Sequence, residues 1–236
     1  MSLIFRPLFE KESSTYTYLL ADSQTKEAVI IDAVSETKQR DIDLIEELGL
    51  DLKYIIETHV HADHITSSCP LKDRFSQAQI VLGSANSVTC ADILIKDGES
   101  LAFGKYQIKA LSTPGHTDGC MSYVIDDKVF TGDALLIRSC GRCDFQGGSA
   151  KKLYNAIQYL FTLPEATLVY PAHDYGGRTV SSIWEEKTFN EMIGGGVDQV
   201  EFIHRVDAME LSLPAKIHVA VPSNQVCGSR IITKEP

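Results

Sequence analysis

The sequence has no long hydrophobic run, no signal-like N-terminus and comparatively few basic residues. No apolar stretch approaches the roughly 20 residues that a membrane-spanning helix needs. The first residues, MSLIFR, lack the charged and then apolar pattern of a secretory signal. With 22 Lys and Arg against 32 Asp and Glu, the formal charge is −10, which argues against nucleic acid because phosphate binding depends on clustered cations.

These absences predict a cytoplasmic protein with no membrane and no nucleic-acid partner. A mitochondrial matrix location is expected instead if the source is eukaryotic and a transit segment is missing from this sequence.

Cysteine is also sparse, with six residues spread along 236. A chain of this length buries enough core to fold without disulfides, so we expect all six thiols to be reduced. Cys140 and Cys143 form a C-x-x-C pair, but the pair lies outside a thioredoxin-like βαβ setting. It is therefore weak evidence for redox or zinc chemistry.

Short β-branched runs alternate with amphipathic stretches, which predicts an α/β protein. The expected strands are residues 15–20, 28–31, 54–57, 79–82, 106–111, 121–125, 129–131 and 168–170, with a hairpin turn at Asp126-Asp127. The expected helices are 37–48, 149–163, 182–192 and 197–211, and Pro70 lies where another helix could begin. With no repeat or clear linker, we interpret 1–236 as a single domain in which 179–236 is a C-terminal elaboration.

The segment THVHADH at 58–64 holds three histidines and an aspartate. It follows a predicted strand, and residues two apart in an extended chain point to the same side, so His59 and His61 can face one point. Asp63 and His64 come next in the loop. Imidazole and carboxylate without thiolate suit Fe, Zn, Mn or Ni rather than Ca.

Three further potential ligands follow predicted strands: His116 in STPGHTDG, Asp133 in FTGDALL and His173 in YPAHDYG. Strand ends are where α/β sheets build their sites. Each residue alone could be structural, but their repeated placement predicts a metal centre. His204 and His218 lack such a setting, and we assign both to the surface or the core.

The series Thr-His-x-His-x-Asp-His, Pro-Gly-His-Thr, Gly-Asp-Ala and Pro-Ala-His resembles the metallo-β-lactamase superfamily over about residues 3 to 178. The resemblance implies an α/β four-layered αββα sandwich. It also implies ligands for two metals, with His59, His61 and His116 around one, Asp63, His64 and His173 around the other, and Asp133 bridging them. Two-metal hydrolysis is thus chemically open.

The flanking sequence favours a different chemistry. ALLIRSCGRCDFQGGS after Asp133, DYGG after His173 and AVPSNQVCG near the end resemble the persulfide dioxygenase family. That family implies an iron-dependent enzyme with one Fe(II) per chain, held by His59, His116 and Asp133. These three residues would then be both metal ligands and the catalytic set, while His61, Asp63, His64 and His173 would orient them or hold a second metal.

The same resemblance implies that glutathione persulfide is oxidised with O₂ and water to sulfite and glutathione, by a homodimer. Glutathione carries two carboxylates, so we expect Arg142 to make a bidentate contact and Tyr175 to hydrogen-bond the tripeptide. Arg138 is a weaker candidate. The alternative for Arg142 is a structural salt bridge with Asp144.

Other functions fit the sequence less well. A hydroxyacylglutathione hydrolase (glyoxalase II) would share the seven ligands but typically carries an Asn-Pro-Phe-type motif, where this chain has FNEMIGGG at 189–196. A β-lactamase would usually be exported, and a nuclease of the superfamily would carry a basic arm. A binding module without catalysis is disfavoured by the presence of every metal ligand.

Overall fold

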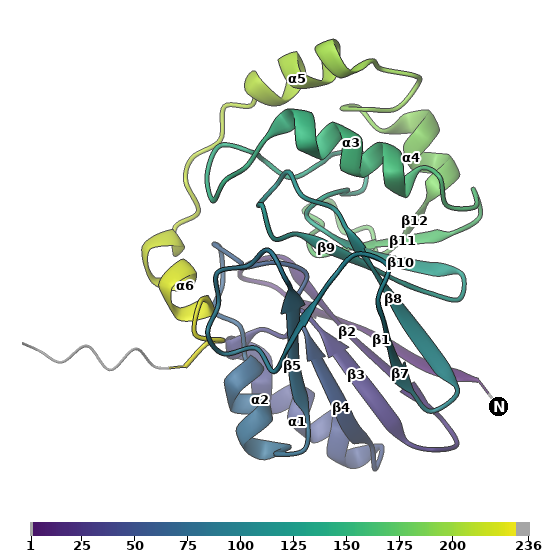
Figure 1. Cartoon of the computed structure of the whole chain (residues 1–236), viewed down its shortest axis with the longest axis vertical. Coiled ribbons are helices and arrows are strands. Elements are labelled where there is room, and N and C mark those ends of the chain that lie inside the picture. Colours follow the sequence, from purple (N-terminus) through teal and green to yellow (C-terminus); the bar gives the residue numbers. More distant parts are fainter. Residues whose placement is uncertain (1, 230–236) are drawn as a thin grey trace, which may run out of the picture.

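Two six-stranded sheets face one another in a computed structural model of the chain, which describes residues 2–229 (Figure 1). The first sheet has the order β1-β2-β3-β4-β5-β6. Its strands are β1 Leu3–Glu10, β2 Thr15–Asp22, β3 Glu27–Ile31, β4 Asp51–Ile56, β5 Gln79–Gly83 and β6 Ile93–Ile95. From β3 to β6 neighbouring strands are parallel, so β3, β4 and β5 all end at the same edge of the sheet.

The second sheet has the order β12-β11-β10-β9-β8-β7. Its strands are β7 Ser100–Phe103, β8 Tyr106–Ser112, β9 Met121–Ile125, β10 Lys128–Gly132, β11 Leu168–Pro171 and β12 Ser181–Ser182. Because β9 is antiparallel to both of its neighbours and β10 is parallel to β11, the strands β8, β10 and β11 end at one edge.

Helices cover the outer face of each sheet (Figure 1). One side carries α1 and α2, and the other carries α3, α4 and α5, while α6 lies at the end of the sandwich. The helices are α1 Lys38–Glu47, preceded by a 3₁₀ turn at Ser35–Thr37, α2 Ser68–Arg74, α3 Ala150–Leu160, α4 Ile183–Phe189, α5 Gln199–Asp207 and α6 Ile217–Asn224. No helix within residues 2–229 is long and apolar enough to cross a membrane.

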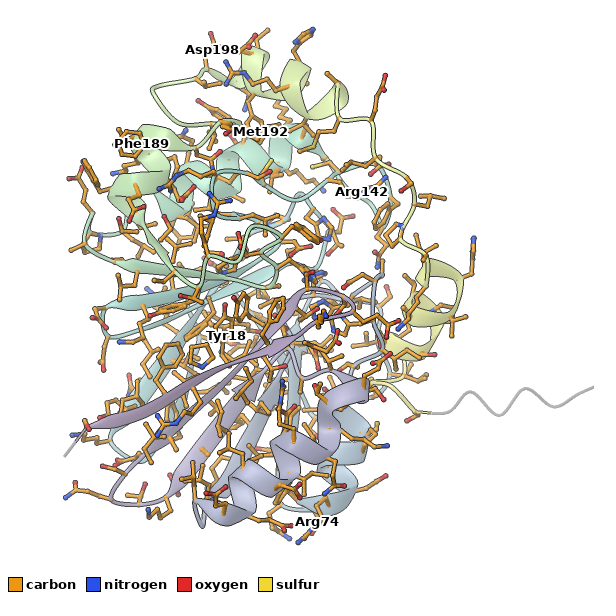
Figure 2. The ribbon with its side chains drawn as sticks, turned by 180° about the vertical axis from the view of Figure 1, so that it is seen from behind. Tyr18, Arg74, Arg142, Phe189, Met192 and Asp198 are labelled. Atoms are coloured by element: carbon orange, nitrogen blue, oxygen red, sulfur yellow. A yellow bond between two sulfur atoms is a disulfide. The ribbon has the colours of Figure 1, made fainter. Side chains whose placement is uncertain are left out.

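Three apolar clusters hold these four layers together. Successive side chains of β3 point to opposite faces of the first sheet. Val29 and Ile31 face the second sheet, whereas Ala28 and Ile30 face the helices. Between the sheets the core is aromatic, and Tyr18 lies at its centre (Figure 2). The third cluster joins the second sheet to α3, α4 and α5. The expected αββα sandwich is confirmed.

The expected strands are all present, and the hairpin at 126–127 joins β9 to β10. Three helices end at least three residues earlier than the sequence suggests. The stretch expected at 149–163 ends at Leu160. The stretch expected at 182–192 ends at Phe189 because Asn190 leaves the helical conformation, and its side-chain oxygen accepts the Met192 and Ile193 amides. The stretch expected at 197–211 ends at Asp207, so residues 208–216 form an irregular strap.

The expectation of six reduced thiols is wrong for two of them. Cys90 and Cys227 form a disulfide across 137 residues of sequence. The pairing could not be read from the sequence because it depends on α6 returning to the first sheet. The other four cysteines are free, Cys140 and Cys143 included.

The aromatic core makes a stability prediction. Phe130 on β10 is 1% exposed and contacts the rings of Phe5, Tyr18 and Tyr170. Phe130→Ala should lower the free energy of unfolding by about 3–5 kcal/mol because it leaves a cavity between the sheets. Urea unfolding measures this, with Val200→Ala at an exposed position of α5 as a control near zero. A loss below about 1 kcal/mol at Phe130 would contradict the proposed packing.

Candidate metal centre

The strand ends of the two sheets meet at one place and bring all seven expected ligands together. The loop after β4 supplies His59, His61, Asp63 and His64, while β8, β10 and β11 lead to His116, Asp133 and His173. Gly132 permits the approach: its φ is +53°, and a Cβ there would lie 2.7 Å from Thr58 Oγ1. The ligand atoms form two groups, each within 4.8 Å: His59, His116 and Asp133, and His61, Asp63, His64 and His173.

In the first group, hydrogen bonds fix the tautomer of both histidines. His116 Nδ1 lies 2.7 Å from the Arg142 carbonyl, which only accepts, so Nδ1 carries the proton. His59 Nδ1 lies 2.9 Å from Thr58 Oγ1, and that hydroxyl already donates to Asp32 at 2.8 Å. Thr58 therefore accepts from His59. Both Nε2 atoms are left with free lone pairs, as a metal ligand requires.

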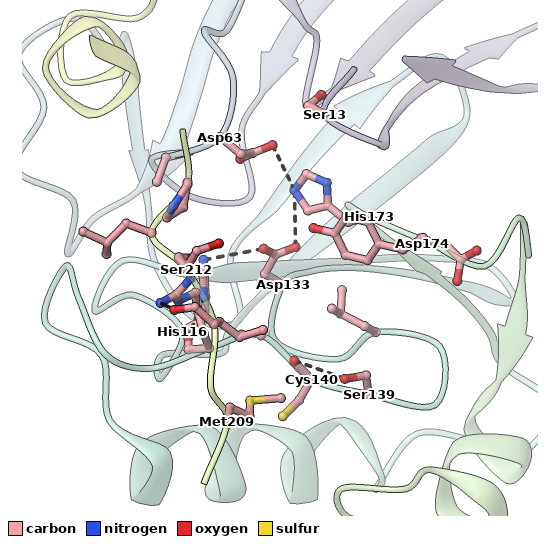
Figure 3. A pocket seen from close by; sticks show the side chains of 18 of the residues that line it. Ser13, Asp63, His116, Asp133, Ser139, Cys140, His173, Asp174, Met209 and Ser212 are labelled. Carbon is pink, nitrogen blue, oxygen red and sulfur yellow. Dashed lines mark hydrogen bonds and ion pairs between the residues drawn. The ribbon is translucent and has the colours of Figure 1, made fainter. Parts of the chain in front are cut away.

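Asp133 completes the first group. Its Oδ2 lies 3.6 Å from His116 Nε2, and its Oδ1 lies 3.7 Å from His173 Nε2 (Figure 3). The Oδ1 atom is buried and has no hydrogen-bond partner within residues 2–229. A buried carboxylate oxygen without a donor is costly, so an ion between these residues would satisfy it. The donor set of two imidazoles and one carboxylate fits a divalent transition metal.

The second group is partly satisfied by its own members. Asp63 Oδ2 lies 3.0 Å from His64 Nδ1 and 3.6 Å from His173 Nε2. Although burial alone would raise the pKa of Asp63, the neighbouring His173 and His64 hold this pKa well below its ordinary value. His61 Nδ1 and His64 Nε2 have no partner among the described residues. Each of these atoms can serve as a further nitrogen ligand once its imidazole is neutral.

The environments of His59 and His61 differ in charge. Burial, reinforced by the neighbouring His61 and His116, lowers the pKa of His59 well below its usual value, so its imidazole is neutral. Burial would also lower the pKa of His61, but Asp32 and Glu57 raise it well above the usual value. His61 Nε2 lies 3.2 Å from Asp32 Oδ1 and 3.3 Å from Glu57 Oε2.

Sequence reasoning missed Asp32, Glu57 and Thr15, which support these ligands. Thr15 Oγ1 lies within 3.3 Å of His64 Nδ1 and 3.4 Å of His173 Nδ1. Asp32 follows the strand β3 directly, and the strand-end rule that selected Asp133 could have found it. Glu57 follows β4 directly, so the same rule could have found it. Thr15 is the first residue of β2 and carries no such signal.

A cavity of about 730 Å³ opens beside the first group. His116, Asp133 and His173 line it, together with residues of the strap between Met209 and Lys216 (Figure 3). Its apolar lining includes Leu136, Ile137 and Phe145, and three cations also line it: Arg142, Arg178 and Lys216. This size is typical of small-molecule sites.

Each expected substrate residue lines this cavity. Tyr175 is 76% exposed, and its ring stacks on His173 at 6.1 Å. Arg142 donates to both oxygens of Asp144 at 2.6 Å, so the salt bridge considered as its alternative role is present. Arg142 also donates to the carbonyls of Leu211 and Ser212 in the strap. Arg138, the weaker candidate, instead pairs with Glu185 and Glu186.

The C-x-x-C pair holds two poorly reactive thiols. Cys140 lines the cavity, but burial raises its pKa well above the ordinary thiol value. Burial likewise raises the pKa of Cys143 to about 12. Neither thiol is ionised near neutral pH, so neither is a ready nucleophile.

The fold and this ligand set define a class. Residues 11–83 and 91–173 match the metallo-beta-lactamase superfamily, and the chain belongs to that superfamily. The match does not extend to α4, α5 or α6, so relatives that align over the C-terminal part define the family more narrowly.

Within the superfamily the chain belongs to the persulfide dioxygenase family. It is 47% identical over 229 residues to the mitochondrial persulfide dioxygenase ETHE1 of Mus musculus, covering 96% of this chain and 89% of that protein. The crystal structure of ETHE1 from Myxococcus xanthus has a TM-score of 0.93 at 49% identity, covering 96% of this chain and all of that one. Glyoxylase B2 of Dictyostelium discoideum is 32% identical over 255 residues, covering 92% of this chain and 87% of its own.

The first group makes a prediction about metal content. Asp133→Ala removes the only charged member of His59, His116 and Asp133, so the purified variant should retain less than about a tenth of the wild-type metal. Elemental analysis after anaerobic iron loading measures this. His204→Ala, on the exposed side of α5, should keep the wild-type content. Full metal retention in Asp133→Ala would refute this ligand assignment.

Proposed function

We propose that this enzyme is an iron-dependent sulfur dioxygenase that oxidises glutathione persulfide with O₂ and water to sulfite and glutathione. The one observation that carries the proposal is the first group. Two histidines with fixed Nδ1 protons have free Nε2 lone pairs, and their ligand atoms and that of Asp133 lie within 4.8 Å of one another. A two-histidine, one-carboxylate set leaves positions open for substrate and oxygen, and it is typical of non-haem Fe(II) oxygenases.

The roles of the side chains follow from their contacts. Bound iron would supply adjacent open positions and the electrons that O₂ activation requires. Asp133 provides the negative charge, while the Arg142 carbonyl and Thr58 hold the two imidazole rings in orientation. Apolar Leu136, Ile137 and Phe145 line the approach and limit water around the reacting sulfur.

The cavity offers contacts suited to a tripeptide with two carboxylates. Arg142 and Tyr175 are the proposed substrate-binding residues. The Tyr175 hydroxyl keeps its proton at neutral pH, so it can donate a hydrogen bond. Arg142 has most of its donors committed to Asp144 and the strap, so a bidentate contact would require Asp144 to be displaced. Arg178 and Lys216 line the same cavity, where Arg178 pairs with Asp174 and Lys216 pairs with Glu12 and Glu36.

A hydroxyacylglutathione hydrolase is the second candidate. The unpartnered atoms of His61 and His64 favour it, since they could hold a second ion for two-metal hydrolysis. The dioxygenase is preferred because the relatives named for it are more similar to this chain over a greater share of its length. In our proposal the second group positions the ligands of a single iron.

The proposal also covers the oligomeric state and the cellular location. We propose that the enzyme is a homodimer and that it works in the cytosol, or in the mitochondrial matrix if the source is eukaryotic. The name of the mouse relative places that protein in mitochondria.

The proposed reaction gives a direct test. Fe(II)-loaded protein given glutathione persulfide should consume one O₂ for each sulfite formed, and chelation should abolish the uptake. Zinc-loaded protein is the matched control and should consume no O₂, because zinc has no redox chemistry. Hydrolysis of S-lactoylglutathione by the same samples without O₂ uptake would replace this proposal with the hydrolase.

The role of Arg142 is tested separately. If Arg142 contacts a substrate carboxylate, Arg142→Ala should raise KM about tenfold or more, because a charged hydrogen bond is lost, with metal content unchanged. Asp144→Ala is the comparison, since it frees the guanidinium without removing it and should leave KM equal or lower. An unchanged KM in Arg142→Ala, or an equal rise in both variants, would restrict Arg142 to its salt bridge.

A further inference from the structure

The loop that carries four of the expected ligands contains no helix or strand of its own. Residues 57–67, between β4 and α2, include His59, His61, Asp63 and His64. Without a regular hydrogen-bond ladder, the backbone carbonyls and amides of this loop need other partners. Those partners decide how firmly the imidazoles are held.

Asn224, the last residue of α6, supplies three of them. Its Nδ2 donates to the His61 carbonyl at 2.9 Å and to the His64 carbonyl at 2.8 Å. Its Oδ1 accepts the Thr66 amide at 2.9 Å. The side chain is 3% exposed, so these bonds are shielded from water. One amide thus fixes the backbone at both ends of the segment that holds Asp63.

The chain after Asn224 stays in contact with the same region. We call residues 223–228 the C-terminal brace. The Cys227 carbonyl accepts the Cys69 amide at 2.9 Å. Gly228 has a φ of +75°, and a Cβ there would lie 2.0 Å from the Thr66 carbonyl, so only glycine permits this approach.

A single covalent bond ties the brace to the first sheet. The Cys90–Cys227 disulfide links it to the segment between β5 and β6. Cys227 is 1% exposed, whereas Cys90 is half-buried, so Cys90 Sγ is the sulfur that a reagent reaches. This bond lies outside the substrate cavity, and the proposed reaction does not use it.

We propose that Asn224 is a positioning residue of the metal centre. We also propose that the redox state of the Cys90–Cys227 disulfide determines how firmly Asn224 holds the ligand loop. While the disulfide is closed, the brace holds the His61 and His64 backbone and the metal is retained tightly. When the disulfide is reduced, the brace loosens and the metal is held less tightly. This inference rests on the proposed metal centre.

The reductant is a low-molecular-weight thiol. Its thiolate attacks Cys90 Sγ, the bond between the two cysteines breaks, and Cys227 leaves as a thiolate that takes up a proton. A second thiolate then attacks the small-molecule sulfur of this mixed disulfide, and Cys90 leaves as a thiolate that takes up a proton. Two small thiols become one small disulfide, and the protein gains two thiol groups.

The first test compares metal binding in Asn224→Asp and the wild type. The aspartate keeps the size of the side chain and an acceptor for Thr66, but it removes both donors to the ligand loop. The dissociation constant for Co(II), measured by competition with a chelator, should rise at least about tenfold. The visible spectrum of the bound Co(II) should also shift, which a purely structural role would not cause.

Asp198→Ala provides a control for general destabilisation. Asp198 caps α5 by accepting the Glu201 amide, so its loss weakens the fold at a helix that packs in the third apolar cluster. Within residues 2–229 this helix has no backbone hydrogen bond to residues 57–67. Metal affinity in this variant should match the wild type. Equal affinities in Asn224→Asp and the wild type would overturn the inference alone. A wild type that binds no metal at all would overturn the proposed function as well.

The second test addresses the disulfide. Reduction of the wild type with glutathione, verified by counting thiols, should raise the Co(II) dissociation constant by about fivefold or more after the glutathione is removed. Cys90→Ser should show the raised value before and after the same treatment. In the Asn224→Asp background, Cys90→Ser should add little, because both changes act through the same contacts. A Cys90→Ser variant with wild-type affinity would overturn the redox coupling.

Discussion

The burial of polar side chains between the ends of two sheets is the constraint on which the rest of the structure depends. All five histidines of the centre are at most 5% exposed. A buried polar group without a partner costs free energy, so every imidazole needs a donor, an acceptor or an ion. Asp32 meets part of that need from the first sheet: it binds Thr58 twice and lies beside His61. The aromatic core between the sheets then fixes how closely the strand ends approach.

The sequence predicts much of this arrangement for a physical reason. Strand ends are local features, and the ligand types that follow them, such as His59 and Asp133, stand next to recognisable β-branched runs. By contrast, the sequence did not predict β1. This strand contains Pro7 and lies at the edge of its sheet, where the missing backbone amide of proline is tolerated, but proline interrupts the residue pattern that marks a strand. The helix α6 contains Pro222 and β-branched residues, and its sequence does not resemble a helix.

Long-range pairing accounts for what local patterns could not give. The Cys90–Cys227 disulfide, the contacts of Asn224 and the strap over the cavity all depend on where the chain returns after α5. Arg142 illustrates the same limit. Its sequence neighbour Asp144 suggested a salt bridge, and the structure has one, but its bonds to the strap carbonyls join segments about 70 residues apart. The local sequence could therefore identify Arg142 as a charged candidate, but it could not predict which strap carbonyls accept its hydrogen bonds.

The two ligand groups differ in how far the negative charge of their aspartate is compensated by neighbouring side chains, and this difference affects which substrate each reaction would favour. Asp63 is surrounded by His64 and His173, so much of its charge is compensated within the protein. Asp133 Oδ1 has no hydrogen-bond partner among residues 2–229, and the nearby His59 is held neutral. A divalent ion in the first group would therefore meet one carboxylate and two neutral imidazoles, which leaves one net positive charge. That charge favours an anionic sulfur ligand at an open position, as a persulfide would be, over a neutral thioester carbonyl.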